Sequence, residues 1–120
     1  GFWTTNGEYL LRPEALESWY HAWRATGDAK YQDWAWAAFE AINATCTAGK
    51  DGGLSGLRNV DAARGGAFND HQESFLFAET LKYAYLIQSG DAPWQISAER
   101  QNQFVFSTEA HLLAVAGPPS

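Results

Sequence analysis

The sequence predicts an all-α chain, and three observations lead to this fold class. Apolar residues recur at helical spacing from Leu16 to Trp23 and again from Tyr31 to Ile42. The stretch 70–87 contains no Gly or Pro, and its apolar residues cover nearly the whole circumference of a helix. Phe104–Phe106 is a short apolar run typical of a strand. We therefore expect three helices and little β structure.

The first two helices are predicted at about 13–26 and 29–45. Pro13 fits the first helical turn, and Gly27 suits the position that follows a helix C-terminus. Asp28 can cap the second helix directly, so the connection is very short. Two helices joined this closely should pack antiparallel as a hairpin.

Composition limits the class of protein. The chain has 120 residues and a formal net charge of −6, which argues against nucleic acid as a partner. No apolar run approaches the roughly 18 residues of a membrane span. The first residues lack the basic and apolar regions of a signal peptide, and the chain contains no Met. These features suggest a processed or excised piece of a longer chain.

The third predicted helix, 70–87, carries a carboxylate on an apolar surface. We expect Asp70 to cap this helix, with Glu73 three residues on as in a capping box. In an α-helix, Phe75 and Tyr83 would share one face with Glu79. An ionised carboxylate in apolar surroundings needs a partner. Either Glu79 faces a polar cavity, where carboxylates beside aromatic rings suit a sugar, or it pairs with Lys82 at the surface.

A long loop separates the second and third helices. Residues 47–69 contain six glycines and predict an irregular excursion, with a short hairpin expected around 53–60. Loops of this length in a compact domain are usually functional or disordered.

The start of the first helix holds a pair of carboxylates. Glu14 and Glu17 are three residues apart and project from one helix face. They are either a solvated first turn, which suits the helix dipole, or a pair used for acid–base chemistry or for holding a cation. Arg12 can orient one of them or bind a polar substrate.

The segment 107–111 offers oxygen ligands. Thr108 and Glu109 lie next to each other, and His111 follows closely. Hydroxyl, carbonyl and carboxylate oxygens are the donors that calcium prefers, and an ordinary turn is the alternative.

Other residues carry weaker signals. The Trp residues at helical spacing are predicted to be core, and His21 and His71 to be surface residues. Cys46 is the single cysteine, so it is either a buried thiol or pairs with a cysteine outside this piece. Asn43 begins an N-glycosylation sequon, which by itself supports secretion only weakly.

Taken together, these motifs resemble class I α-1,2-mannosidases, glycoside hydrolase family 47. The motifs are Leu11–Ser18, Arg24–Asp28 with Tyr31 and Trp34, Gly52–Ser55, Glu73–Tyr83 and Ser107–His111. The resemblance covers nearly the whole chain, and each motif is several residues long. The Gly-rich loop and the Trp content resemble the secreted fungal branch.

The resemblance implies an (αα)₇ barrel with calcium at its floor. Residues 1–120 would be the C-terminal segment of a single catalytic domain, comprising the last barrel helices and a short closing β-hairpin. Such an incomplete domain would explain why the third helix lacks partners. The implied activity is hydrolysis of α-1,2-linked mannose in high-mannose N-glycans, with inversion of configuration, in the secretory pathway or outside the cell.

The resemblance also implies roles for individual residues. Glu14 matches the proposed general base, and Thr108 matches the calcium ligand, which binds through its hydroxyl and carbonyl oxygens. The residues implied to contact the substrate or to belong to the calcium and sugar shell are Arg12, Glu17, Phe75, Glu79 and Glu109. Ser107 and Leu112 depart from the usual family residues, and neither change touches the oxygen ligands.

The family's general acid has no counterpart in this sequence. Inverting glycosidases need an acid and a base about 6.5–9.5 Å apart. We therefore expect this chain alone to be inactive and the N-terminal remainder of the enzyme to be its partner. A glycan-binding module of the same fold is the alternative, and a helical interaction domain with solvated glutamates is a third possibility.

Overall fold

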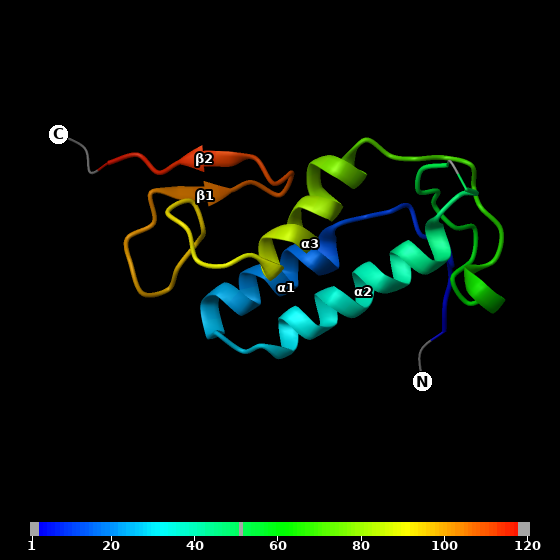
Figure 1. The fold of residues 1–120 in the computed structure, drawn as a ribbon, viewed down its shortest axis with the longest axis horizontal. Coiled ribbons are helices and arrows are strands. Elements are labelled where there is room, and N and C mark those ends of the chain that lie inside the picture. Colours follow the sequence, from blue (N-terminus) through cyan, green and yellow to red (C-terminus); the bar gives the residue numbers. More distant parts are fainter. Residues whose placement is uncertain (1–2, 51, 118–120) are drawn as a thin grey trace.

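The computed structural model describes residues 3–50 and 52–117 and is mostly helical, as predicted. The α-helices are α1 (Glu14–Thr26), α2 (Lys30–Cys46) and α3 (Leu81–Gln88). Two short helical segments are η1, a 3₁₀ turn at Ala63–Gly65, and η2, a π-helical segment at Leu76–Thr80. The strands β1 (Phe104–Phe106) and β2 (Leu112–Ala114) complete the fold. Figure 1 shows the three α-helices packed together, with the strands at one end of the molecule.

The first two helices form the predicted antiparallel hairpin (Figure 1). Gly27 ends α1 in the left-handed conformation, with φ 71°, and its amide donates to the Trp23 carbonyl at 2.7 Å. The Asp28 carboxylate accepts a hydrogen bond from the amide of Lys30 at 3.0 Å, so it caps the first turn of α2. Pro13 directly precedes α1, where its missing amide costs nothing.

The larger core cluster lies where all three α-helices meet. Leu16 and Tyr20 of α1, Ala35 of α2 and Tyr83 of α3 are buried there. The ring centroids of Tyr20 and Tyr83 are 5.6 Å apart. Phe106 of β1 packs its ring edge-on against Tyr20, with centroids 5.8 Å apart, and this contact joins the β-hairpin to the helices.

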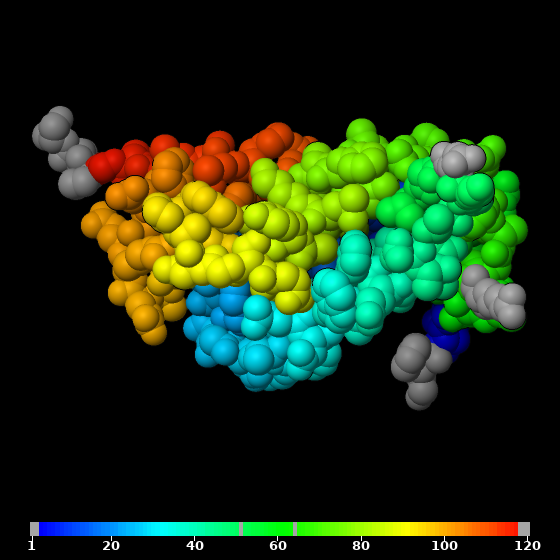
Figure 2. All heavy atoms as spheres, in the orientation of Figure 1, coloured from blue at the N-terminus to red at the C-terminus, as the bar shows by residue number. Residues whose placement is uncertain are grey.

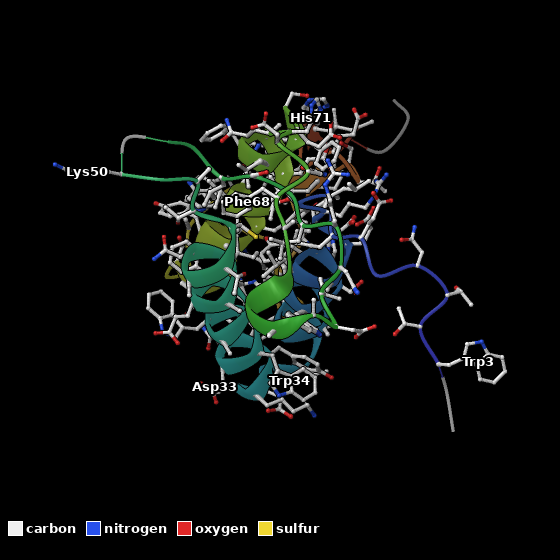
Figure 3. The ribbon with its side chains drawn as sticks, turned by 90° about the vertical axis from the view of Figure 1, so that its right-hand side faces the viewer. Trp3, Asp33, Trp34, Lys50, Phe68 and His71 are labelled. Carbon is white, nitrogen blue, oxygen red and sulfur yellow. The ribbon has the colours of Figure 1, made fainter. Side chains whose placement is uncertain are left out.

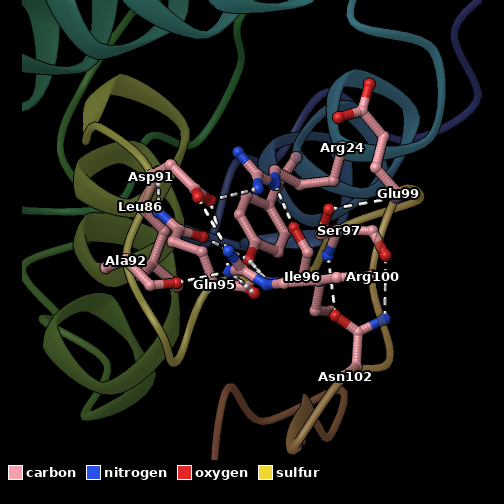
Figure 4. A network of polar contacts seen from close by, with 11 residues as sticks. Arg24, Leu86, Asp91, Ala92, Gln95, Ile96, Ser97, Glu99, Arg100 and Asn102 are labelled. Atoms are coloured by element: carbon pink, nitrogen blue, oxygen red, sulfur yellow. Dashed lines mark hydrogen bonds and ion pairs between the residues drawn. The ribbon is translucent and has the colours of Figure 1, made fainter.

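A polar network fastens the loop after α3 to α1 (Figure 4). Gln95 is only 2% exposed, and its side chain accepts a hydrogen bond from the Tyr20 hydroxyl at 2.6 Å and donates to the Leu86 carbonyl at 3.0 Å. Asp91 binds both Arg24 at 2.9 Å and Arg100 at 2.7 Å. Buried polar groups are stable only when paired, and these pairings fix the course of the loop.

A smaller core cluster lies at the opposite end, where the long loop returns to the helices. Leu11, Ile42, Cys46, Leu57 and Leu76 are buried in it. The hairpin expected around 53–60 is absent from the described loop, so this prediction was wrong. Leu57 instead pairs with two distant segments, through isolated bridges to Tyr9 and Phe68. The loop satisfies its backbone groups partly against Tyr9 and partly within itself, as in the bond from the Arg58 amide to the Ala67 carbonyl at 2.9 Å.

The third helix begins later than predicted. Asp70 has φ 60° and does not cap a helix, because the chain stays irregular until Ser74. The helix then opens with the π-helical segment η2, in which the Leu81 amide donates to the Leu76 carbonyl. The wider π turn rotates the residues that follow, so Tyr83 is fully buried while Phe75 and Glu79 remain partly exposed. The shared face of these three residues stays a prediction, and the Glu79 charge is among the causes that raise the pKa of Tyr83.

Much of the apolar surface of η2, α2 and α3 is uncovered in this chain. Phe77 is 62% exposed, Tyr85 67% and Trp36 50%. A groove between α2 and α3 is lined by Trp36, Phe39, Leu81 and Tyr85. Figure 2 shows α2 in cyan beside the green and yellow third helix on this face. The predicted shortage of partners for the third helix is thus confirmed within the described residues.

Two minor predictions need correction. Trp19, Trp23 and Trp94 pack against the core, whereas Trp3, Trp34 and Trp36 are exposed. Figure 3 shows Trp3 and Trp34 at the periphery of the molecule. His71 is exposed as predicted, but His21 is half-buried beside Tyr20, and burial lowers the pKa of its imidazole. Among the described helices, none has the length and apolar character needed to cross a bilayer.

Candidate active site

Residues from two separate segments meet at the start of α1. The Arg12 guanidinium lies over the Phe75 ring, 5.5 Å from its centroid, and its Nη1 is 3.4 Å from Oε1 of Glu14. Arg12 and Glu14 flank Pro13 at the helix N-terminus, and Phe75 directly precedes η2. Both side chains of the ion pair are more than half exposed, so the pair stabilises the fold little. Together with the ring, the pair places a carboxylate, a guanidinium and an aromatic face side by side.

Four glutamates of this region lie close enough to influence one another electrostatically. Burial raises the pKa of Glu79 above its ordinary value, and the negative charges of Glu109, Glu14 and Glu17 raise it further. Burial and the charge of Glu14 likewise raise the pKa of Glu17. Glu14 and Glu17 come from α1, Glu79 from η2 and Glu109 from the turn of the β-hairpin. The fold thus collects carboxylates that are far apart in sequence into one negative field.

Glu79 does not pair with Lys82, so the surface ion-pair interpretation of Glu79 was wrong. Lys82 points instead to the β-hairpin, where its Nζ donates a hydrogen bond to the Ala110 carbonyl and lies 5.7 Å from the Phe106 ring centroid. Among the described residues, Glu79 makes no salt bridge. The polar-cavity alternative for Glu79 stays a prediction.

The turn of the β-hairpin carries Thr108 and Glu109. Residues Phe104–Phe106 pair antiparallel with Leu112–Ala114, so residues 107–111 form the connection. Inside it, the Ser107 amide donates to the His111 carbonyl at 2.9 Å, and the Ala110 amide donates to the Ser107 carbonyl at 2.8 Å. Ala110 is fully buried with φ 57°. These bonds give the turn one defined shape, with Thr108 and Glu109 exposed at its tip.

Two side chains of α3 hold this turn in place. The Tyr83 hydroxyl donates to the Ser107 carbonyl at 2.9 Å, and Lys82 binds the Ala110 carbonyl. Burial and the nearby Glu17 charge raise the pKa of Tyr83, so its hydroxyl stays a proton donor at neutral pH. Sequence reasoning missed both contacts, because a side chain that binds a distant carbonyl leaves no local pattern.

The oxygen atoms at the turn suit a hard cation. Within residues 3–50 and 52–117, neither the hydroxyl nor the carbonyl of Thr108 forms a hydrogen bond with the protein. Both oxygens are therefore available beside Glu109, whose carboxylate lies 3.7 Å from the His111 imidazole, while Arg12 contacts Glu14. No group of three or more His, Cys, Asp or Glu side chains in the described part of the chain is placed to bind a metal directly. Hydroxyl and carbonyl oxygens are donors that calcium prefers, and a calcium site at Thr108 stays a prediction.

Two further candidate residues lie away from this cluster. Asn43 is exposed on α2, and the hydroxyl of Thr45, the third sequon residue, donates to the Ala41 carbonyl at 2.6 Å. Its glycosylation stays a prediction. Cys46 is fully buried in the smaller core cluster, in agreement with the buried-thiol interpretation.

Comparison with known proteins identifies the family. The sequence profile described as Glycosyl hydrolase family 47 matches residues 3–115. The chain belongs to glycosyl hydrolase family 47.

Relatives in this family are fungal enzymes of much greater length. Mannosyl-oligosaccharide alpha-1,2-mannosidase 1B of Aspergillus phoenicis is 53% identical over 116 residues, which are 97% of this chain and 22% of that protein. Mannosyl-oligosaccharide alpha-1,2-mannosidase of Penicillium citrinum is 51% identical, with the same coverage. The chain therefore spans about a fifth of the length of the curated relatives it matches.

A solved structure agrees with this family assignment. The alpha-1,2-mannosidase from Trichoderma reesei superposes on 97% of this chain with a TM-score of 0.90 and 50% identity, and the match covers 24% of that protein. The resemblance deduced from the sequence motifs is thus confirmed. Every residue that the family 47 resemblance assigned to catalysis, substrate or metal lies within the matched range 3–115.

Proposed function

We propose that this chain is the C-terminal part of a calcium-dependent, inverting exo-α-1,2-mannosidase that trims high-mannose N-glycans. The observation that carries the proposal is the convergence of Arg12, Glu14 and Phe75 with the carboxylates of Glu17, Glu79 and Glu109. A guanidinium, an aromatic face and several carboxylates are the groups that bind a hexose. The matched relatives are named for α-1,2-mannosidase activity, which supports the choice of sugar and linkage.

Glu14 serves as the general base in this proposal. It is exposed to the shared space, and Arg12 contacts one of its oxygens, which leaves the other oxygen for a water molecule. The base would remove a proton from this water as it attacks the anomeric carbon from the face opposite the leaving oxygen. The carboxylate of Glu17 lies one helical turn further along α1. It is placed to accept hydrogen bonds from hydroxyl groups of the same sugar.

Phe75 and the remaining carboxylates would form the sugar site. The Phe75 ring offers an apolar face for the C–H groups of the terminal mannose. The Arg12 guanidinium lies over the same ring and helps to hold it in place. Glu79 and Glu109 accept hydrogen bonds from hydroxyl groups. The raised pKa of Glu79 reflects its burial first and the neighbouring negative charges second, and a bound cation and sugar hydroxyls would offset both.

Thr108 would hold the calcium ion through its hydroxyl and its carbonyl oxygen. Both oxygens lack protein partners in the described structure and lie next to Glu109. When bound, the ion would bind sugar hydroxyls and offset the negative charge of the carboxylates. Residues of this chain would contact it mainly through Thr108, with the carboxylates acting through water.

The remaining parts of the site and fold would come from the rest of the same enzyme. The general acid has no candidate in this segment, so the segment alone would be inactive. The groove lined by Trp36, Phe39 and Tyr85 would pack against other helices of an (αα)₇ barrel. Exposed apolar surface of this kind marks an interface. A secretory location, with a glycan on Asn43, completes the proposal.

The test uses the intact enzyme that contains this segment. It would be incubated with α-1,2-linked mannobiose, and the anomer of the released mannose would be followed by proton NMR. We expect β-mannose as the first product and little cleavage of the α-1,3-linked control. First release of α-mannose would exclude inversion, and binding without any cleavage would leave only the glycan-binding alternative.

A further inference from the structure

A single hydrogen bond joins the two backbone segments that carry the carboxylates. The Thr80 hydroxyl donates to the Leu11 carbonyl at 2.5 Å, and both residues are fully buried. Thr80 directly follows Glu79 at the end of η2. Leu11 directly precedes Arg12, three residues before α1 begins at Glu14. The bond therefore ties Glu79 to the segment of Arg12 and Glu14.

Leu11 adopts a conformation that this residue type avoids. Its φ is 59°, in the left-handed region, where a branched side chain is strained. Such strain persists only where the surroundings over-determine it, and it gathers at functional sites. Leu11 is held on its side-chain side by Ile42, Cys46 and Leu76, and on its carbonyl side by Thr80.

The left-handed turn decides where the next residues point. After it, the Arg12 guanidinium reaches the Phe75 ring and Glu14, and the Tyr9 hydroxyl binds the Arg12 carbonyl at 3.4 Å. The π-helical start of the third helix places Thr80 toward Leu11 while Glu79 remains partly exposed. A π segment inside a helix often marks a functional site.

We propose that Thr80 is a positioning residue for the reaction: by holding the Leu11 carbonyl, it keeps Arg12 and Glu14 opposite Glu79. The inference rests on the proposed function, because it assumes that Glu14 acts as the base. Thr80 itself touches no substrate. A base displaced by about 1 Å can cost about 10² in rate, so the loss of one buried hydroxyl should be visible in turnover.

The decisive variants in the intact enzyme are Thr80→Val, which keeps the shape and removes the hydroxyl, and Thr80→Ser, which keeps the hydroxyl and loses a methyl. We expect Thr80→Val to lower kcat about 10²-fold with little change in KM, and Thr80→Ser to retain kcat although it melts at a lower temperature. Melting temperatures are measured with kcat for both variants, because the unpaired Leu11 carbonyl in Thr80→Val also costs stability. Thr26→Val is the control, since its hydroxyl also donates to a backbone carbonyl, that of Ala22 at 2.7 Å, at the far end of α1.

Other outcomes are equally informative. If Thr80→Val kept kcat within about twofold, or if kcat fell in proportion to melting temperature in both variants, the proposal would be overturned. Should Thr80→Val not fold, Thr80→Ala and Thr80→Ser form a second pair that differ only in the hydroxyl, with the same expected split. If no variant without the hydroxyl folds, Thr80 is merely structural and the proposal is wrong. Glu14→Gln separates the two hypotheses, because an active Glu14→Gln enzyme refutes the base assignment and an active Thr80→Val enzyme refutes only the positioning role.

Discussion

The Arg12 guanidinium lies over the Phe75 ring, 5.5 Å from its centroid, and the same side chain contacts Glu14 at 3.4 Å. This relationship joins the start of α1 to the start of the third helix. Residues 47–75 separate that helix from α2 in the sequence. A planar guanidinium that stacks on a ring while it binds a carboxylate is held in orientation as well as in place. The candidate base therefore has its neighbour fixed before any substrate arrives.

Replacement of Thr108 tests the metal site. In the intact enzyme, calcium should raise the melting temperature, because a ligand bound only by the folded state stabilises it by about 2.7 kcal/mol at 100 times its Kd. Thr108→Ala removes one ligand oxygen and leaves the carbonyl, so calcium affinity should fall at least about tenfold while the protein still folds. Isothermal calorimetry with calcium as the titrant measures this change.

A control is available near the start of the chain. Thr5→Ala alters an exposed threonine away from the carboxylate cluster and should leave calcium affinity unchanged. An unaltered calcium affinity in Thr108→Ala would show that Thr108 is not a ligand.

Glu79 gives the site a pH-dependent effect on stability. Burial and the neighbouring carboxylates raise its pKa, so the folded state holds the proton to a higher pH than the unfolded state does. Its contribution to stability is complete below the unfolded pKa of about 4.3 and is lost as pH rises through the raised folded pKa. With calcium chelated, Glu79→Gln should therefore raise the melting temperature at about pH 7 and not at about pH 4.

Thermal melts across this pH range, with Glu40→Gln as a control on the exposed surface of α2, check the prediction. An equal gain at both pH values would show that the effect of Glu79→Gln is not electrostatic.

Local sequence signals predicted the helices but not every boundary between them. Gly27 and Asp28 act through their own backbone and nearest neighbours, so the α1–α2 connection formed as expected. Asp70 had the pattern of a cap, but its segment is held by tertiary hydrogen bonds, such as that between its amide and the Ser55 hydroxyl at 3.1 Å. Such contacts override local propensity because they satisfy buried backbone groups.

The candidate site was predictable as a set of residues and not as a geometry. Motif resemblance selected Arg12, Glu14 and Glu79, and the fold brings them together. The partner of Lys82 was not predictable, because the Ala110 carbonyl comes near only after the β-hairpin packs on α3. The π segment at Leu76–Thr80 likewise leaves no sequence pattern that differs from an α-helix.

The buried pair of Tyr20 and Gln95 should stabilise the junction between α1 and the loop after α3. The Gln95 side chain accepts a hydrogen bond from the Tyr20 hydroxyl at 2.6 Å, and Gln95 is 2% exposed. Gln95→Leu leaves that hydroxyl without its partner, so unfolding of the intact enzyme by urea should show a loss of about 1–3 kcal/mol. Tyr20→Phe removes the other partner, and the double variant should lose less than the sum of the single losses. Strict additivity would indicate that the hydrogen bond contributes nothing.

Comparison of Glu14→Gln with Glu17→Gln assigns the two carboxylates of α1. Glutamine keeps the shape and hydrogen-bonding capacity of Glu14 but cannot take a proton from water, and loss of a general base typically costs about 10²–10⁴ in rate. Glu14→Gln in the intact enzyme should therefore lose kcat by this factor while it binds mannose analogues nearly as well as the parent. Glu17 lies one turn further along α1, is half-buried, and has a pKa raised by burial and by Glu14, so its replacement should weaken substrate or calcium binding as well as turnover. Steady-state kinetics with α-1,2-mannobiose and calorimetry with a mannose analogue separate the two effects. Near-normal turnover in Glu14→Gln together with an inactive Glu17→Gln would move the base to Glu17.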